Sequence, residues 1–181
     1  MTEIFIIVLI ALLLWSVSIY NNLVRDKNRV QAGWSDIDVQ LKLRHSLVPN
    51  LVTATKQYAS YEQAVLTTVT ELRTQSQNAN TMDERSSSEE QLGVGLQKLV
   101  ALVEQYPDLK ANENFGKLQD ELVEVEEKIQ YARRYYNGAV RGFNITIERF
   151  PNLIIARLFN YQPSSFFQLE SDEMRKAVKV G

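Results

Sequence analysis

A run of 21 residues without a charge, from Ile4 to Val24, places the strongest constraint on the fold of this chain: "IFIIVLIALLLWSVSIYNNLV". A helix rises 1.5 Å per residue, so the run is about 31 Å long as a helix, close to the roughly 30 Å hydrocarbon core of a bilayer. We therefore expect residues 1–24 to form a transmembrane anchor. A cleaved signal peptide is one alternative, because "SVS" at 16–18 places small residues where a peptidase cuts, but no Lys or Arg precedes the run. A buried core helix is another, but it needs neighbours that cover all of its faces.

The charges beside this run predict its orientation. Arg25, Lys27 and Arg29 follow the run, whereas only Glu3 precedes it. The positively charged flank of a transmembrane helix stays on the cytoplasmic side. We expect a single-pass protein with its N-terminus outside and the residues from 25 onward in the cytoplasm.

The first helix is expected to continue out of the membrane. Val30, Trp34, Ile37 and Leu41 are spaced by 4, 3 and 4 residues, which places them on one stripe of a helix. Pro49 has no amide hydrogen and disfavours a helical residue before it, so we expect this helix to end near residues 44–46. A kink within one longer helix is the alternative.

Two further amphipathic helices are predicted before Pro107. The second carries an apolar stripe from Leu51 to Leu72 and fades in the polar stretch "TQSQNANTMD". The third is expected to begin with a capping box at one of three serines. Each serine stands three residues before a Glu or Gln, in the pairs Ser86 with Glu89, Ser87 with Glu90 and Ser88 with Gln91. The third stripe runs from Leu92 to Tyr106, where Pro107 ends it.

The fourth predicted helix is the longest and the most regular. Its apolar residues advance by alternating steps of 3 and 4 from Phe115 to Phe143, the heptad spacing of left-handed coiled-coil packing, until Phe150 and Pro151 close it. Each helix has one apolar stripe to bury, and short loops favour antiparallel neighbours. We therefore predict an all-α fold in which the transmembrane helix continues into an antiparallel, up-and-down four-helix bundle over residues 25–150.

The bundle predicts contacts between its first and fourth helices. Counting 1.5 Å per residue from the membrane end puts Trp34 level with Gly138, and Asp38 level with Arg133. We expect the indole to face the glycine and the aspartate to pair with the arginine. Gly138 and Gly142 are expected to mark a close approach between helices.

The residue types give little support for chemistry. The chain has no cysteine and one histidine, His45, which excludes Cys-ligated metals and the paired Glu-x-x-His motifs of di-iron bundles. Asp38 lies seven residues before His45, about 10 Å away along a helix, too far to share one ion. We predict no catalytic, metal or cofactor residue and no enzyme, and expect Arg44 to pair with a carboxylate on a neighbouring helix. A net charge of −2 gives no reason to expect nucleic acid.

The C-terminal part divides into an apolar segment, residues 151–169, and a polar tail, residues 170–181. The apolar segment, together with the residues beside it, is too apolar to lie free in water. It must therefore dock on the base of the bundle, in the lipid interface, or on a neighbouring subunit. Its interaction candidates are large apolar side chains: Phe150, Leu158, Phe159, Phe166 and Phe167.

Four stretches together resemble the LemA family of bacterial membrane proteins: "YNNLV" at 20–24, "AGWSDIDVQLKLRHSLVPNLV" at 32–52, "ARRYYN" at 132–137 and "FNITIERFPNLIIARLF" at 143–159. The resemblance implies a single N-terminal transmembrane helix with the N-terminus outside and a cytoplasmic helical bundle. It implies no enzymatic activity. Family members related to magnetosome-associated proteins suggest a role in membrane organisation.

These observations favour a non-enzymatic scaffold in the bacterial inner membrane. Its expected partners are membrane lipid, further copies of itself in a homo-oligomer, and a membrane-protein partner. The alternative is an adaptor that binds another membrane protein in envelope signalling or quality control.

Overall fold

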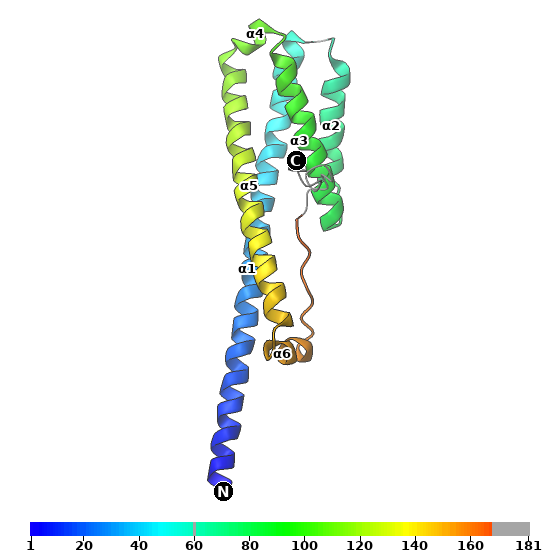
Figure 1. Ribbon diagram of the computed structural model, residues 1–181. Helices are drawn as coiled ribbons and strands as arrows, with labels where there is room; N and C mark the ends of the chain where they lie inside the picture. Colours follow the sequence, from blue (N-terminus) through cyan, green and yellow to red (C-terminus); the bar gives the residue numbers. More distant parts are fainter. Residues whose placement is uncertain (60, 168–181) are drawn as a thin grey trace, which may run out of the picture. The chain divides into compact units, whose positions relative to one another are not determined.

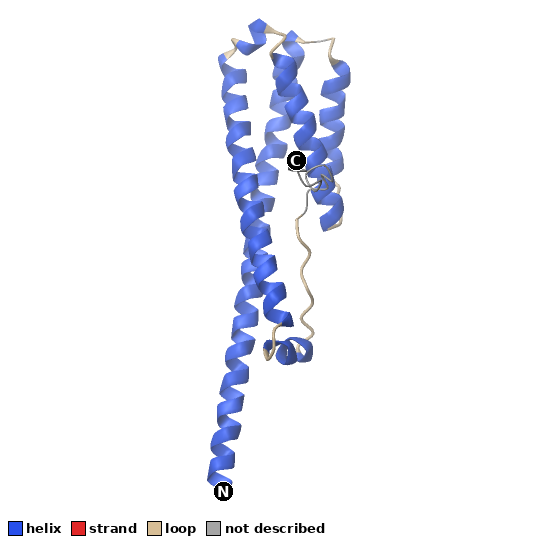
Figure 2. Ribbon diagram, viewed as in Figure 1, coloured by secondary structure: helices blue, strands red, loops and turns tan. Residues whose placement is uncertain are grey.

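The computed structural model describes residues 1–59 and 61–167, and these residues form helices and connecting turns without a strand (Figures 1 and 2). The helices are α1 (Thr2–Tyr58), α2 (Gln63–Gln77), α3 (Met82–Val103), α4 (Pro107–Lys110), α5 (Glu113–Glu148) and α6 (Asn152–Leu158). The predicted all-α class is confirmed for this part of the chain. The predicted polar tail, 170–181, lies outside the described residues.

Helix α1 is one continuous helix of 57 residues, as expected for an anchor that continues without a break. The prediction that Pro49 ends it is wrong. Of the alternative, a kink within one longer helix, the structure shows the single longer helix. Pro49 lies on an exposed side of α1, while Val48 and Leu51 beside it are buried, so packing of the neighbouring residues holds the helix through the proline.

The segment after Pro49 is also divided differently from the prediction. The expected second helix consists of two pieces, the end of α1 and the separate helix α2, because the chain leaves the helical conformation between Tyr58 and Gln63. Helix α3 begins four residues before Ser86. Its capping box pairs Thr81 with Glu84, and the three serines stand inside the helix.

The fourth predicted helix is α5, and Pro107 begins α4 after α3 has ended at Val103. The stripe on α5 is buried at Phe115, Leu122, Val125, Ile129, Tyr136, Phe143 and Ile147. A short helix that sequence periodicity did not indicate, α6, follows Pro151.

The chain divides into two compact units. The first unit contains residues 1–38 and 130–166, and the second contains residues 39–129 together with Phe167. In the second unit α2 packs along α3 (Figure 1), where Gly95 lets the backbone of α3 approach α2: a Cβ there would lie 3.1 Å from a methyl carbon of Leu72. The apolar core of the first unit is built from Leu23, Val30, Ile37, Tyr136, Val140, Phe143 and Ile147, and that of the second unit from Leu41, Val48, Leu51, Leu66, Val69, Leu92, Leu96, Leu99, Phe115 and Leu122.

Candidate functional site

The second unit contains a buried group of polar side chains, here called the ionic cluster: Arg44, His45, Ser76, Glu89 and Glu126. Its members come from α1, α2, α3 and α5, and the side chains of Arg44, His45 and Glu89 are almost completely buried. Arg44 forms an ion pair with the Glu89 carboxylate, and it donates to the Glu89 carbonyl at 2.9 Å and to Glu126 Oε1 at 2.8 Å. The expectation that Arg44 pairs with a carboxylate on a neighbouring helix is confirmed.

His45 completes the cluster from the next position on α1. Its Nε2 lies 2.9 Å from Glu89 Oε1 and 3.2 Å from the Ser76 hydroxyl oxygen. One imidazole nitrogen therefore contacts both the carboxylate and the hydroxyl group. The single histidine is thus held by a glutamate on α3.

Pro49 and the ionic cluster are connected through a backbone carbonyl. In a helix the amide of residue 49 would donate to the carbonyl of His45, and proline has no amide hydrogen. Arg73, on α2, donates to this carbonyl through Nε at 2.8 Å. A side chain from a neighbouring helix therefore supplies the hydrogen bond that Pro49 removes, which is one reason why α1 passes through the proline.

The electrostatics of the ionic cluster favour the ionised state of Glu89. Burial alone would raise the pKa of its carboxyl, but the hydrogen bond from His45 and the charge of Arg44 together lower that pKa to about 2. Burial likewise opposes the charge of Arg44, and the carboxylates of Glu126 and Glu89 raise the pKa of its guanidinium. The cluster is thus a mostly buried contact among helices, in which Arg44 lies between two carboxylates and only Glu126 is partly exposed.

Glu89 is the residue of this cluster that sequence reasoning misplaced. The sequence makes it one of three candidates for the capping box of α3. It stands three residues before Leu92, and the series Glu89, Leu92, Leu96, Leu99, Val103 advances by 3, 4, 3 and 4. This series puts the glutamate on the buried stripe of α3. The sequence signal that could have found this site is a glutamate in the apolar series of α3, together with Arg44 and His45 on α1.

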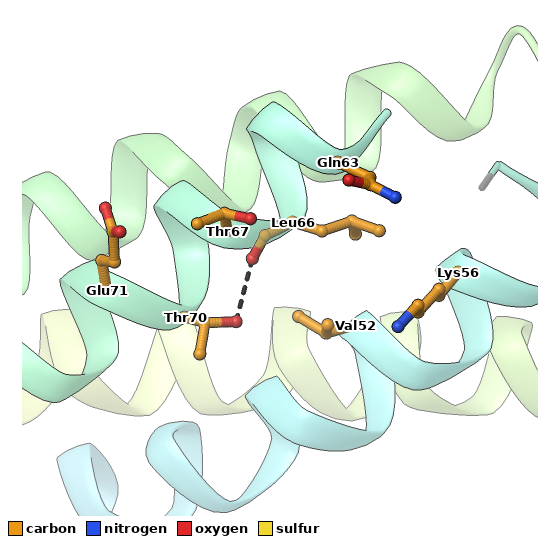
Figure 3. Close-up of a pocket in the computed structure, with 7 residues that line it drawn as sticks. All are labelled: Val52, Lys56, Gln63, Leu66, Thr67, Thr70 and Glu71. Atoms are coloured by element: carbon orange, nitrogen blue, oxygen red, sulfur yellow. Dashed lines mark hydrogen bonds between the residues drawn. The ribbon is translucent and has the colours of Figure 1, made fainter. Parts of the chain in front are cut away.

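An open groove of about 350 Å³ lies between the end of α1 and α2 (Figure 3). Val52 and Leu66 form its apolar part, and Lys56 and Glu71 lie among the polar side chains that line it. The Thr70 hydroxyl donates to the Leu66 carbonyl at 2.9 Å, so it is satisfied within its own helix. Among the described residues no group of three His, Cys, Asp or Glu side chains is placed to hold a metal ion.

In the first unit, the close approach of helices is at Gly33. A Cβ on Gly33 would lie 3.1 Å from the Cα atom of Tyr136 and 3.1 Å from a ring carbon of Tyr135. Trp34 packs its ring on Tyr136, with the ring centroids 5.9 Å apart. The expectation that Gly138 faces Trp34 at a close approach is wrong, because a Cβ on Gly138 or on Gly142 would meet nothing within 4 Å beyond its own stretch of α5. Asp38 and Arg133 both belong to the first unit, and their pairing stays a prediction.

The candidates of the C-terminal segment have three different surroundings. The Phe159 ring lies against Tyr20 of α1, with centroids 4.6 Å apart. Phe166 is half-buried and Phe167 is buried, whereas Phe150 and Leu158 are 75% and 73% exposed.

The residues after α6 are held on α5 by hydrogen bonds. Asn144 binds Ser164 twice: its Nδ2 donates to the Ser164 carbonyl at 3.0 Å, and its Oδ1 accepts from the Ser164 amide at 2.9 Å. The Tyr136 hydroxyl donates to the Ser165 carbonyl at 2.8 Å. Tyr161 packs edge-on against Phe143, and Lys27 of α1 lies over the same tyrosine ring at 5.4 Å. This part of the segment therefore docks within the chain's own first unit.

These features define an all-helical protein with one long apolar N-terminal helix, of the kind found in single-pass membrane proteins. The model of the LemA family matches residues 33–181. This chain belongs to the LemA family, as the four sequence stretches indicated.

Curated relatives include proteins from magnetotactic bacteria and from a mycoplasma. The chain is 27% identical over 175 residues to magnetosome protein MamQ 2 of Paramagnetospirillum magneticum and 25% identical over 174 residues to magnetosome protein MamQ of Magnetospirillum gryphiswaldense, and each match covers 82% of this chain and 64% of the relative. It is 28% identical over 155 residues to protein LemA of Metamycoplasma hominis, which covers 84% of this chain and 70% of that protein. The chain thus spans less than two thirds of the length of the MamQ proteins. None of these names denotes an enzymatic activity.

Proposed function

We propose that this protein is a non-enzymatic helical scaffold, anchored in the bacterial inner membrane by the start of α1, that self-associates and organises the membrane around it. The observation that carries the proposal is the exposure of the apolar part of α1. The most apolar 18-residue window of this helix has a mean hydropathy of 2.4, and 6% of it is buried. The large apolar side chains from Ile4 to Val17 expose half or more of their surface. So large an apolar surface needs lipid around it.

The Ser16 side chain within this stretch also suits a hydrocarbon environment. The Ser16 hydroxyl donates to the Leu12 carbonyl at 2.8 Å, so it is satisfied inside the helix and needs no water. Beyond this stretch, Ile19 and Leu23 are buried in the first unit.

Two other interpretations of the apolar run fit less well. A core helix is a poor alternative because most of the run has no covering neighbour among the described residues. A cleaved signal peptide would have to be cut within a continuous helix.

The remaining helices support a rigid scaffold. We propose that α2, α3 and the parts of α1 and α5 that belong to the second unit pack as an antiparallel, up-and-down four-helix bundle, with the ionic cluster fixing which helices meet. The heptad spacing of α5 and the buried stripes of α1 and α3 support this arrangement. The side chains of Arg44, His45 and Glu89 are almost completely buried and contact one another, in keeping with a structural role.

Self-association is proposed through an exposed face of α5. Tyr131, Tyr135, Gly138, Gly142 and Ile145 advance by 4, 3, 4 and 3 residues, so they share one stripe of the helix. The three larger side chains are more than half exposed, and the space beside both glycines is open. Glycines on an exposed stripe let a second helix approach closely. In this proposal Gly138 contacts a neighbouring copy.

The absence of cysteine makes the orientation of the anchor directly testable. Thr2→Cys and Gln97→Cys each introduce one thiol at an exposed position of the full chain. In spheroplasts a membrane-impermeant maleimide is expected to label Thr2→Cys at once and Gln97→Cys only after lysis. The reverse pattern would contradict the orientation, and labelling of both in intact spheroplasts would contradict the anchor.

Crosslinking tests self-association. Ile145→Cys in membranes is expected to give a disulfide-linked dimer of this chain. Gly138→Leu, which fills the open space on the face, should abolish the dimer, whereas Gly116→Leu, at another open glycine of α5, should leave it intact. A crosslink that joins Ile145→Cys only to a different membrane protein would replace the scaffold with the adaptor.

A further inference from the structure

Helix α6 presents an apolar face that nothing in the described chain covers. Ile154 and Leu158 stand four residues apart on one side of it and are 58% and 73% exposed, while Ala156 on another side is buried. Phe150 and Phe159, which flank the helix, are also more than half exposed. Four large apolar side chains within ten residues form a patch of the kind that marks an interaction site.

The position of α6 within the first unit indicates what covers this patch. Phe159 packs on Tyr20, and Tyr20 belongs to the uncharged run of α1 that ends at Val24. Four residues of helix separate Tyr20 from the end of that run, which is about 6 Å along the helix axis. Interfacial helices bury their apolar face by roughly 5–10 Å at the boundary between headgroups and acyl chains. The end of α6 therefore meets α1 at the depth where such a helix lies.

The charges around α6 fit the same surface. Arg149 precedes α6, Arg157 lies in its last turn, and both are exposed. Arg25, Lys27 and Arg29 add positive charge just after the uncharged run. The acidic side chain among them, Asp26, forms ion pairs with Arg25 and Arg29. Glu148 is the acidic neighbour of Arg149. Basic side chains beside a buried apolar face attract anionic lipid headgroups.

We propose that α6 lies in the bilayer interface, with Phe150, Ile154, Leu158 and Phe159 among the acyl chains and headgroups of the leaflet through which α1 leaves the membrane. The proposal rests on the membrane anchor proposed above. It gives the first unit two attachments to lipid, one across the bilayer and one along its surface. The hydrogen bonds of Asn144 to Ser164 then connect the lipid-bound helix back to α5.

Nitroxide spin labels on single cysteines test this proposal in the full chain. The protein is reconstituted in vesicles of phosphatidylethanolamine and phosphatidylglycerol, and the accessibility of each label to oxygen, which concentrates in lipid, is compared with that to a water-soluble nickel chelate. Labels at Ile154→Cys and Leu158→Cys are expected to show an oxygen-to-nickel ratio several-fold higher than the label at the exposed Gln97→Cys. A ratio equal to that at Gln97 would overturn the proposal, and so would protection from both reagents, the result if a second copy covers α6.

Two further comparisons separate the proposals. A label at Leu13→Cys reports the anchor alone: an aqueous ratio there would overturn the proposed function, whereas a lipid ratio at Leu13 with an aqueous ratio at Leu158 would overturn only the role of α6. The double variant Arg149→Gln with Arg157→Gln removes both basic groups of α6. It is expected to lower the oxygen-to-nickel ratio at Leu158 without changing the ratio at Leu13. An unchanged ratio at Leu158 would contradict the contribution of charge.

Discussion

The two units hold α1 and α5 with different chemistry. In the first unit the contacts are apolar and close, with Gly33 against the backbone of Tyr136 and the Trp34 ring against the Tyr136 ring. In the second unit a buried ionic cluster connects α1 to α3 and α5 through Arg44, Glu89 and Glu126. Apolar contacts tolerate small shifts between helices, whereas a buried ion pair is strongly destabilised when its partner is removed. We infer that the cluster fixes which helices meet and in which register.

The largest effect is expected from removing one charge of this pair. Glu89→Leu leaves Glu126, which is partly exposed, as the carboxylate paired with Arg44, and it leaves His45 without its carboxylate. We expect a loss of about 3–5 kcal/mol in the free energy of unfolding, measured by urea titration of the full chain in detergent micelles. The double variant Arg44→Met with Glu89→Leu should recover much of the loss, because no buried charge then lacks a partner. A double variant as unstable as the single one would contradict the ionic account.

Acid is expected to weaken the second unit and spare the first. The pKa of Glu89 falls from an ordinary value of 4.5 to about 2 in the folded chain, so its contribution is complete above pH 4.5 and is lost as the pH falls toward 2. The difference corresponds to about 3 kcal/mol. Hydrogen exchange read separately for residues 82–103 and 130–148 should show protection lost in the first range over this pH interval. The double variant lacking both charges should not show this additional loss.

Crowding the helix contact is expected to weaken the first unit in turn. Gly33→Leu places atoms where even a Cβ lies 3.1 Å from the backbone of Tyr136, so α1 and α5 must separate. We expect a loss of about 1–3 kcal/mol, typical of overpacking, with faster hydrogen exchange in residues 130–148. Gly138→Leu, at an open position on α5, is the matched control and should not lower the stability of the isolated chain.

The smallest effect is expected at Pro49. Arg73→Met removes the donor to the His45 carbonyl and should reduce stability by about 1–2 kcal/mol. Pro49→Ala restores a backbone amide that can donate to the same carbonyl. Arg73→Met is therefore expected to cost less in the Pro49→Ala background than in the native chain. Equal losses in the two backgrounds, measured as a double-mutant cycle by urea titration, would show that Arg73 acts elsewhere.

The sequence predicted those parts of the fold that depend on local patterns. The apolar run and the stripe from Val30 to Leu41 indicated one helix leaving the anchor, and the heptad spacing indicated α5. The passage of α1 through Pro49 could not be predicted this way, because it depends in part on Arg73 of α2, which lies more than twenty residues after Pro49 in the sequence. The break after Tyr58 had no comparable signal, since no Gly or Pro stands between Tyr58 and Gln63.

For the candidate sites, too, local sequence patterns predicted some features, and others depend on tertiary packing. Arg44 was expected to meet a carboxylate, but which one depends on tertiary packing, and local capping chemistry suggested a different role for Glu89. Trp34 was placed near the correct level of α5, and its ring packs on Tyr136, two residues from the expected Gly138. Counting residues along two helices fixes their relative level to within about one turn, but which side of each helix faces the other depends on its rotation.

The central claim is that the first part of α1 crosses lipid and continues without interruption into the folded helices. A nitroxide scan of the exposed positions between residue 5 and residue 28 of the full chain, in phosphatidylethanolamine and phosphatidylglycerol vesicles, tests it most directly. We predict an oxygen-to-nickel accessibility ratio that rises to one maximum near Leu13 and falls to aqueous values by Asn28. A ratio that oscillates with the helical period would place the helix flat on the surface, and that result, or aqueous values throughout, would contradict the account.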